Sequence, residues 1–201
     1  MPLVERELAR LAEEHSKQSY YQVRDWYNTE ALSAVRRAAI FIYLNKTCFN
    51  GLHRVNRKGH FNVPMGRYTN PKILDRSQLK AAQEQLAKAD VRCAAFQNML
   101  ALCDAGDFVY LDPPYEPMSP TASFTGYTQG GFGQSDQTLL RDVFRELDRR
   151  GCKLMLSNSD VPFIRELYAE YSIVQVSADR AINSKATGRG KVLEVVVRNY
   201  G

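Results

Sequence analysis

A carboxylate, two prolines and an aromatic ring follow directly on a short apolar run at residues 108–111. These residues are Asp112, Pro113, Pro114 and Tyr115. If residues 108–111 form a buried strand, the carboxylate lies at its carboxyl end, where open α/β sheets place their active sites. The prolines fix φ and lack a backbone N–H, so they hold a stiff loop that presents carbonyl oxygens.

This loop suits a flat ligand that carries an amino group. The Asp112 carboxylate and the Pro113 carbonyl can each accept one N–H of such a group, while the Tyr115 ring stacks on its face. Accepting both protons would localise the nitrogen lone pair and make the nitrogen a better nucleophile. The alternative is a simple acidic turn, because Asp-Pro pairs are common in turns. The apolar run before the loop and the aromatic residue after it favour a functional loop.

The positive charge of the chain is concentrated in one segment. The whole chain has a formal net charge of +5, whereas residues 31–72 contain eight basic residues and no acidic one. Aromatic and asparagine residues alternate with these basic residues, as contacts to phosphates and bases require. A charged segment can also be an ordinary solvated face. The asymmetry nevertheless predicts a polyanionic partner for this segment.

The composition excludes several classes of protein. Hydrophobic residues make up 44% of the chain and charged residues 24%, as in ordinary globular proteins. No apolar run approaches the roughly 20 residues that cross a bilayer, and residues 1–10 do not resemble a secretory signal. The four cysteines and three histidines show no metal-ligand spacing. We therefore expect a cytoplasmic protein with reduced, mostly buried thiols, no membrane partner and no metal.

Hydrophobic periodicity predicts helices first and alternating strands and helices afterwards. In the first part we expect helices at 3–14 and 17–43, a loop at 44–52, strands at 52–56 and 60–65 around a hairpin turn, and a helix at 77–89 capped by Ser77. In the second part we expect strands at 91–96, 108–111, 153–157, 172–178 and 192–198, with helices at 136–149 and 161–169. This alternation predicts a mostly parallel sheet. Residues 119–135 are expected to form a mobile loop over the site.

Several motifs together resemble the Dam-type DNA adenine methyltransferases of the alpha group, in which the recognition segment precedes the Asp-Pro-Pro-Tyr loop. The matching segments are residues 41–52, 59–68, 112–115, 124–127, 156–160 and 194–200. The resemblance implies methyl transfer from S-adenosylmethionine to the 6-amino group of an adenine flipped out of double-stranded DNA, at a GATC-like site. It also implies an α/β fold, with part of a Rossmann-like methyltransferase sheet at 89–201. A helical DNA-recognition region with a β-hairpin would precede this sheet at 1–88.

The resemblance assigns roles to individual residues. The catalytic residues would be Asp112, Pro113, Pro114 and Tyr115, and the cofactor would contact Phe96 and Asp112.

Six residues in or beside the hairpin would contact DNA: Lys46, Phe49, Asn50, Leu52, Arg54 and Arg67. Phe49 would wedge into the duplex, and Asn50 would contact the space or partner base left by the flipped adenine. Arg54, a natural bidentate reader of guanine, would touch a base edge beside Leu52.

The sequence departs from the family pattern at the cofactor site. The family has a strand ending in Phe-x-Gly-x-Gly that holds the methionine part of the cofactor, and this motif does not occur in the chain. In the family sheet the strands near this motif lie between those expected at 91–96 and 108–111. We therefore expect residues 108–111 to form an exposed apolar edge, and the chain alone to bind S-adenosylmethionine poorly.

The first hypothesis is an adenine-specific DNA methyltransferase or the carboxyl-terminal portion of one, and three alternatives to it remain open at this point. The chain could be a catalytically inactive duplex-binding remnant, or one half of a two-chain methyltransferase whose complementary chain supplies the glycine motif. It could also be an amino methyltransferase that acts on RNA or protein, although the basic hairpin favours duplex DNA.

Overall fold

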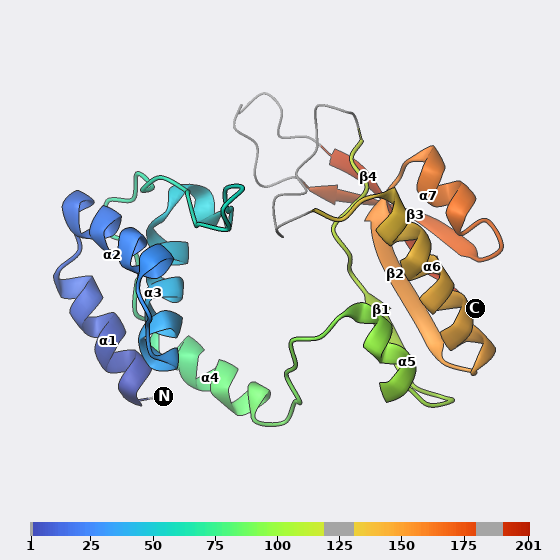
Figure 1. The fold of residues 1–201 in the computed structure, drawn as a ribbon, viewed down its shortest axis with the longest axis horizontal. Coiled ribbons are helices and arrows are strands. Elements are labelled where there is room, and N and C mark those ends of the chain that lie inside the picture. The colour runs from blue at the N-terminus through green and yellow to red at the C-terminus, as the bar shows by residue number, and fades with distance from the viewer. Residues whose placement is uncertain (1, 119–130, 180–190) are drawn as a thin grey trace. The chain divides into compact units, whose positions relative to one another are not determined.

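The computed structural model describes residues 2–118, 131–179 and 191–201 and separates the chain into two units, Met1–Arg92 and Cys93–Gly201 (Figure 1). The first unit is helical, and the second contains a four-stranded sheet with helices. Each unit has its own hydrophobic core.

Three helices form the core of the first unit: α1 (Pro2–Glu13), α2 (Lys17–Thr29) and α3 (Ala34–Thr47). The single helix predicted at 17–43 is wrong, because the chain leaves the helical conformation between α2 and α3. The Ser33 hydroxyl begins α3 by accepting the Arg36 N–H at 3.3 Å, which is the usual role of an N-cap serine. At its other end, α3 continues to Thr47, into the region predicted as a loop.

A fourth helix, α4 (Arg76–Leu86), follows the basic segment. Its N-cap is Asp75 and not the predicted Ser77, since the Asp75 carboxylate accepts the Gln78 N–H at 3.1 Å. A carboxylate at this position also interacts favourably with the helix dipole.

Residues 52–65 turn back on themselves without forming the two predicted strands. One antiparallel bridge joins Val55 to Phe61, and a second joins Cys48 to Met65. The short 3-10 helix η1 (Phe49–Gly51) directly follows Cys48. The segment is therefore a hairpin held by isolated bridges. Further strand pairing is limited because backbone groups of Phe61 and Val63 form hydrogen bonds with side chains of α2, as described below.

The second unit is built on the sheet order β1-β2-β4-β3, made of β1 (Phe108–Leu111), β2 (Lys153–Ser159), β3 (Ser172–Asp179) and β4 (Lys191–Arg198). These strands occur where the sequence predicts them. The prediction of a mostly parallel sheet is wrong, because only β1 and β2 pair in parallel, and β4 is antiparallel to both of its neighbours. A parallel crossover needs about a dozen or more residues, and the connection at 180–190 is shorter.

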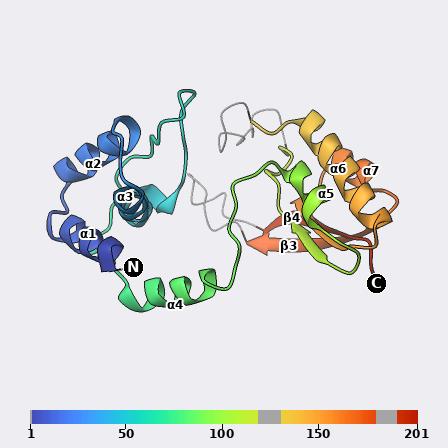
Figure 2. The same cartoon turned by 60° about the horizontal axis from the view of Figure 1, so that its bottom comes forward.

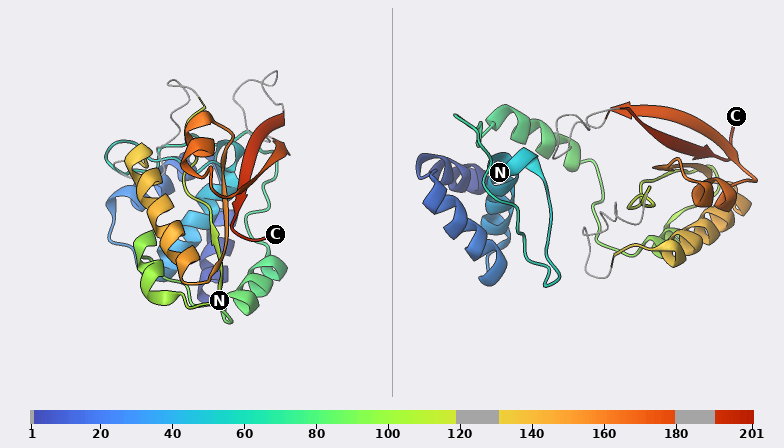
Figure 3. Two further views of the ribbon diagram at one scale, coloured as in Figure 1. Left: turned by 90° about the vertical axis from the view of Figure 1, so that its right-hand side faces the viewer. Right: turned by 90° about the horizontal axis from the view of Figure 1, so that it is seen from above.

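Helices α6 (Gln134–Arg149) and α7 (Pro162–Leu167) lie on the same face of the sheet (Figures 2 and 3). The apolar stripe of α6 packs its Leu140, Phe144 and Leu147 side chains into the core that contains Leu154 and Val195 of the sheet. A short helical segment, η2 (Phe96–Asn98) and α5 (Met99–Leu102), leads into β1. This packing fixes the carboxyl ends of β1 and β2, from which the candidate site emerges.

Strand β1 forms an edge of the described sheet, as the sequence predicts. Phe108 and Tyr110 are 58% and 53% exposed, while Val109 and Leu111 between them are buried. The strand predicted at 91–96 is wrong: residues 91–95 have no regular structure and Val91 is 74% exposed. A strand needs a neighbour for its backbone groups, and no described strand lies beside these residues.

The described residues contain no helix long and apolar enough to cross a membrane, and no group of His, Cys, Asp and Glu side chains suited to a metal ion. All four cysteines are free thiols, and Cys48, Cys103 and Cys152 are buried. Residues 119–130 of the predicted mobile loop lie outside the described residues, whereas residues 134–135 belong to α6.

Candidate functional site

The Asp112 carboxylate lies immediately after β1, and a serine of the neighbouring strand holds it. The Ser157 hydroxyl donates a hydrogen bond to Asp112 Oδ1 at 2.7 Å. Asp112 is exposed, and its Oδ2 accepts no hydrogen bond from the described residues. One carboxylate oxygen is therefore occupied by the protein, and the other is available to a ligand.

Two buried amide side chains hold the rest of the loop. Gln137 of α6 donates its Nε2–H to the Pro114 carbonyl at 2.9 Å, and Asn158 of β2 accepts the Glu116 N–H at 2.9 Å. Asn158 also donates to Gln137 Oε1 at 3.1 Å, so the two amides support each other. Within the described residues nothing donates to the Pro113 carbonyl, which leaves this oxygen free to accept a ligand proton.

Gln137 and Asn158 are functional candidates that the sequence prediction missed. Both are completely buried, and buried polar side chains are nearly always hydrogen-bonded. Gln137 follows the spacing of the apolar stripe of α6, together with Leu140 and Phe144. A polar residue on an apolar stripe was the available signal for a structural hydrogen bond.

The Tyr115 ring is half-buried, and its hydroxyl donates to Glu194 of β4 at 3.4 Å. Burial raises the pKa of the Tyr115 phenol above its usual value, so the ring is neutral at physiological pH. A neutral ring tethered at its hydroxyl is suited to stacking against a flat ligand.

Phe96 lies in η2 and not in a strand. Its ring is half-buried and packs against Phe132 with a centroid distance of 6.0 Å. No hydrogen bond or ring contact among the described residues joins Phe96 to the Asp112–Tyr115 loop.

In the first unit, side chains of α2 form hydrogen bonds with the backbone of the hairpin residues that follow the turn. Asn28 pairs with the backbone of Phe61 through both amide atoms, donating to its carbonyl at 3.0 Å and accepting its N–H at 2.8 Å. Tyr20 and Arg24 both donate to the Val63 carbonyl, at 2.9 and 3.1 Å. The hairpin is thus fixed on the helical core although it lacks regular strands.

The residues predicted to enter the duplex lie in the turn after α3. Phe49 is 40% exposed. Asn50 has a positive φ of 54°, a conformation that asparagine tolerates better than most residues. Asn45 closes this turn by donating to the Gly51 carbonyl at 2.8 Å. Leu52 is half-buried and packs against the core of the first unit, so less of its surface is open to a base.

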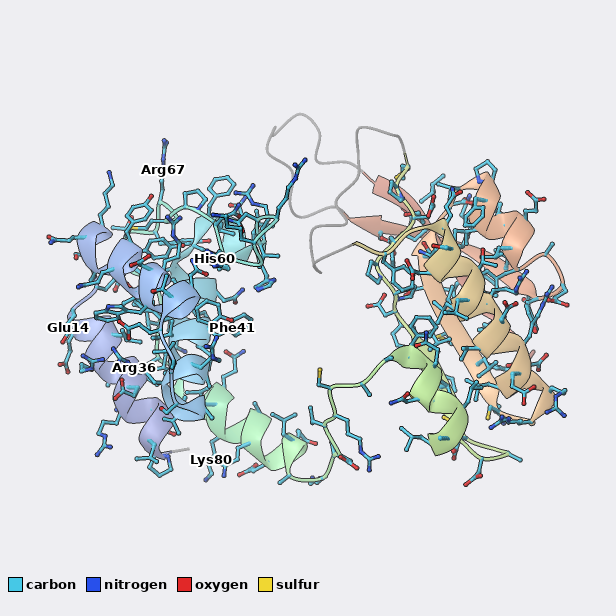
Figure 4. The ribbon with its side chains drawn as sticks, viewed as in Figure 1. Glu14, Arg36, Phe41, His60, Arg67 and Lys80 are labelled. Atoms are coloured by element: carbon cyan, nitrogen blue, oxygen red, sulfur yellow. The ribbon has the colours of Figure 1, made fainter. Side chains whose placement is uncertain are left out.

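Most basic side chains around the hairpin have no acidic partner among the residues that the structure describes. Arg54 is exposed and donates its Nε–H to Asn62 Oδ1 at 2.8 Å. Figure 4 shows Arg67 extending away from the helices of this unit. None of the following exposed residues forms an ion pair within the described part of the chain: Lys46, Arg54, Arg57, Lys58 and Arg67. Exposed cations without ion-pair partners are the kind of groups that a nucleic-acid-binding surface requires.

Comparison with known proteins matches both units of the chain. The family model described as "D12 class N6 adenine-specific DNA methyltransferase" matches residues 3–182. The Type II methyltransferase M.MjaIII of Methanocaldococcus jannaschii is 47% identical over 198 residues, which cover 96% of this chain and 68% of that protein. The Type II methyltransferase M1.LlaDCHI of Lactococcus lactis subsp. cremoris is 42% identical over 193 residues, 94% of this chain and 68% of that protein. A DNA adenine methylase of Vibrio cholerae serotype O1 is 36% identical over 185 residues, 92% of this chain and 66% of that protein.

Proposed function

The chain belongs to the family of D12 class N6 adenine-specific DNA methyltransferases, and from this premise we propose that it methylates the 6-amino group of an adenine flipped out of duplex DNA. The observation that supports this most directly is the Asp112 carboxylate at the end of β1. One of its oxygens is held by Ser157, and the other is open to a ligand.

Asp112 and Pro113 would hold the reacting amine. Asp112 Oδ2 and the Pro113 carbonyl each accept one N–H of the adenine 6-amino group, which localises the nitrogen lone pair for attack. As the methyl group passes from the sulfonium sulfur of the donor to the amine nitrogen, the S–C bond would break, a neutral thioether would leave, and the amine would give up one proton to the Asp112 carboxylate. Pro114 contributes rigidity, because its carbonyl is already bonded to Gln137, and Tyr115 stacks on the flipped base.

S-adenosylmethionine would supply a methyl group that its sulfonium charge already activates. On this chain, Phe96 and Asp112 are the residues we assign to its binding. No described strand leads into a glycine-rich loop that could receive the methionine part, so these residues form only part of a cofactor site.

The unit Met1–Arg92 would recognise the DNA, and the unit Cys93–Gly201 would carry the chemistry. Phe49 wedges into the duplex, Asn50 contacts the space or partner base left by the adenine, and Arg54 reads a guanine edge beside Leu52. The guanidinium of Arg54 is suited to this because Asn62 already orients one edge of it. We propose a GATC-like target site.

Duplex binding is expected to weaken steeply with salt. If Lys46, Arg57, Lys58 and Arg67 each neutralise one phosphate, log Kobs should fall against log[salt] with a slope of about −3.6. Replacing Lys58 by glutamine should reduce this slope by about 1, as measured by fluorescence anisotropy of a labelled duplex. Lys80→Gln, on the exposed surface of α4, is the matched control and should leave the slope unchanged. An unchanged slope for Lys58→Gln would remove the hairpin tip from the interface.

Protection of DNA from an adenine-methylation-sensitive nuclease, after incubation with the chain and S-adenosylmethionine, tests the activity itself.

Two alternatives are supported by the exposed apolar edge of β1, which a further strand could cover. Duplex binding without protection would indicate a binding protein that lacks catalysis. Protection that requires a complementary chain carrying the glycine motif would indicate one half of a two-chain methyltransferase.

A further inference from the structure

The Ser157 hydroxyl lies between two side chains of the neighbouring strand. Strands β1 and β2 are parallel, with Tyr110 beside Met155 and Leu111 beside Leu156. Extending this register by one residue brings Asp112 beside Ser157. Because side chains alternate along a strand, Tyr110 and Asp112 point to the same face. Ser157 is therefore the β2 residue that can reach both of them.

The hydrogen bonds along this row have one direction. The Tyr110 hydroxyl donates to Ser157 Oγ at 2.9 Å, and the Ser157 hydroxyl donates to Asp112 Oδ1 at 2.7 Å. An ionised carboxylate only accepts, and a serine hydroxyl has one proton to give. By accepting from Tyr110, Ser157 keeps its proton directed at Asp112, and successive bonds of this kind strengthen one another.

Ser157 is buried, whereas the carboxylate that it holds is exposed. An exposed aspartate just beyond a strand would otherwise exchange among its rotamers. Since Ser157 occupies Oδ1, the carboxylate keeps Oδ2 free. A buried hydroxyl thus controls which carboxylate oxygen faces the solvent side, where a substrate would arrive.

We propose that Ser157 is a positioning residue for methyl transfer: it fixes the Asp112 carboxylate so that Oδ2 meets the adenine amino group, and Tyr110 orients the Ser157 hydroxyl. This inference rests on the proposed function, because Asp112 is taken as the acceptor of the amine. It adds two residues, from β1 and β2, to the machinery of the loop.

The kinetic test compares Ser157→Ala, Ser157→Thr and Tyr110→Phe with the unaltered chain, in whatever assembly supports methylation. A small misplacement of a reacting group can cost about 100-fold in rate, so kcat should fall by about 10- to 100-fold in Ser157→Ala. The KM for duplex should stay unchanged, since duplex binding belongs to other residues. Ser157→Thr keeps the hydroxyl and should recover most of kcat, and Tyr110→Phe should give an intermediate loss. A Ser157→Ala variant with normal kcat would overturn the inference while leaving the proposed function intact.

A structural test decides whether Ser157 positions Asp112 even if no methylation is detected. A lack of methylation would count against the proposed function and not against this positioning role. Crystal structures of the unaltered protein and of Ser157→Ala should show the Asp112 carboxylate in one rotamer with the hydroxyl present and in several without it. Circular dichroism verifies that the variant is folded, and Ser157→Thr is the second variant should alanine disturb β2. A carboxylate in the same single position without any hydroxyl at residue 157 would overturn the inference.

Discussion

Replacing Asp112 by alanine is expected to lower the rate of methyl transfer by about 100- to 1000-fold, the usual cost of removing one preorganised polar group from a reacting centre. The amine would lose the acceptor that localises its lone pair and takes its proton. Among the described residues the hydrogen-bond partner of the exposed Asp112 side chain is the buried Ser157 hydroxyl, which would lose its acceptor. The free energy of unfolding should therefore fall by about 1 kcal/mol. Initial rates of methylation and urea unfolding curves measure the two effects separately.

The matched control for this variant is Asp142→Ala. Asp142 is an exposed aspartate on α6 in the same unit, and its carboxylate pairs with Arg141. Its removal should leave both the rate and the stability unchanged. If Asp112→Ala methylated DNA at the normal rate, Asp112 would have no role in the chemistry, and the proposed mechanism would fail.

Features set by local sequence were predicted successfully. Strand β1 and the loop after it follow from an apolar run that meets Asp112 and two prolines, and both effects operate within a few residues. The edge position of β1 was also anticipated. The boundary between α2 and α3 was missed, because Ser33 acts as an N-cap only if the chain leaves the helix before it. The helical spacing of the aromatic residues before Ser33 and the alanine-rich stretch after it indicate helix throughout.

Features that depend on distant partners could not be predicted from the sequence. Asn28 satisfies the backbone of Phe61, and this pairing replaces the strand that the pattern at 60–65 suggests. The antiparallel pairing of β3 with β4 is an exception. It could have been predicted, because no helical pattern lies between these two strands in the sequence. The link from Ser157 to Asp112 joins residues far apart in the chain, and it becomes visible only when the register of β1 and β2 is known.

The buried amides show why the loop can be rigid without regular structure. Backbone groups removed from water must find hydrogen-bond partners. In the residues after β1, side chains of two other elements, Gln137 and Asn158, serve as those partners. The same device holds the hairpin of the first unit, where Asn28 of α2 pairs with Phe61. In both units, amide side chains form the hydrogen bonds to backbone groups that an adjacent strand would otherwise form.

Replacing Asn158 by leucine, which has a similar size, is therefore expected to have the largest effect on stability. The Glu116 N–H and Gln137 Oε1 would remain buried without their partner, and each such group costs about 1–3 kcal/mol. The free energy of unfolding of the second unit should fall by about 3 kcal/mol. With a urea dependence of about 2 kcal/mol per M, the midpoint should move down by about 1.5 M. Urea unfolding followed by circular dichroism measures the shift.

Two further variants show whether this cost comes from the broken amide pair. Asn98→Leu changes an exposed asparagine in η2 and should alter stability by no more than about 0.5 kcal/mol. In the double variant Asn158→Leu, Gln137→Leu the unpaired Gln137 oxygen is also removed, so its loss of stability should be smaller than the sum of the two single losses. Strict additivity would mean that the two amides act independently. An Asn158→Leu variant as stable as the unaltered protein would show that the loop after β1 is held by its prolines alone.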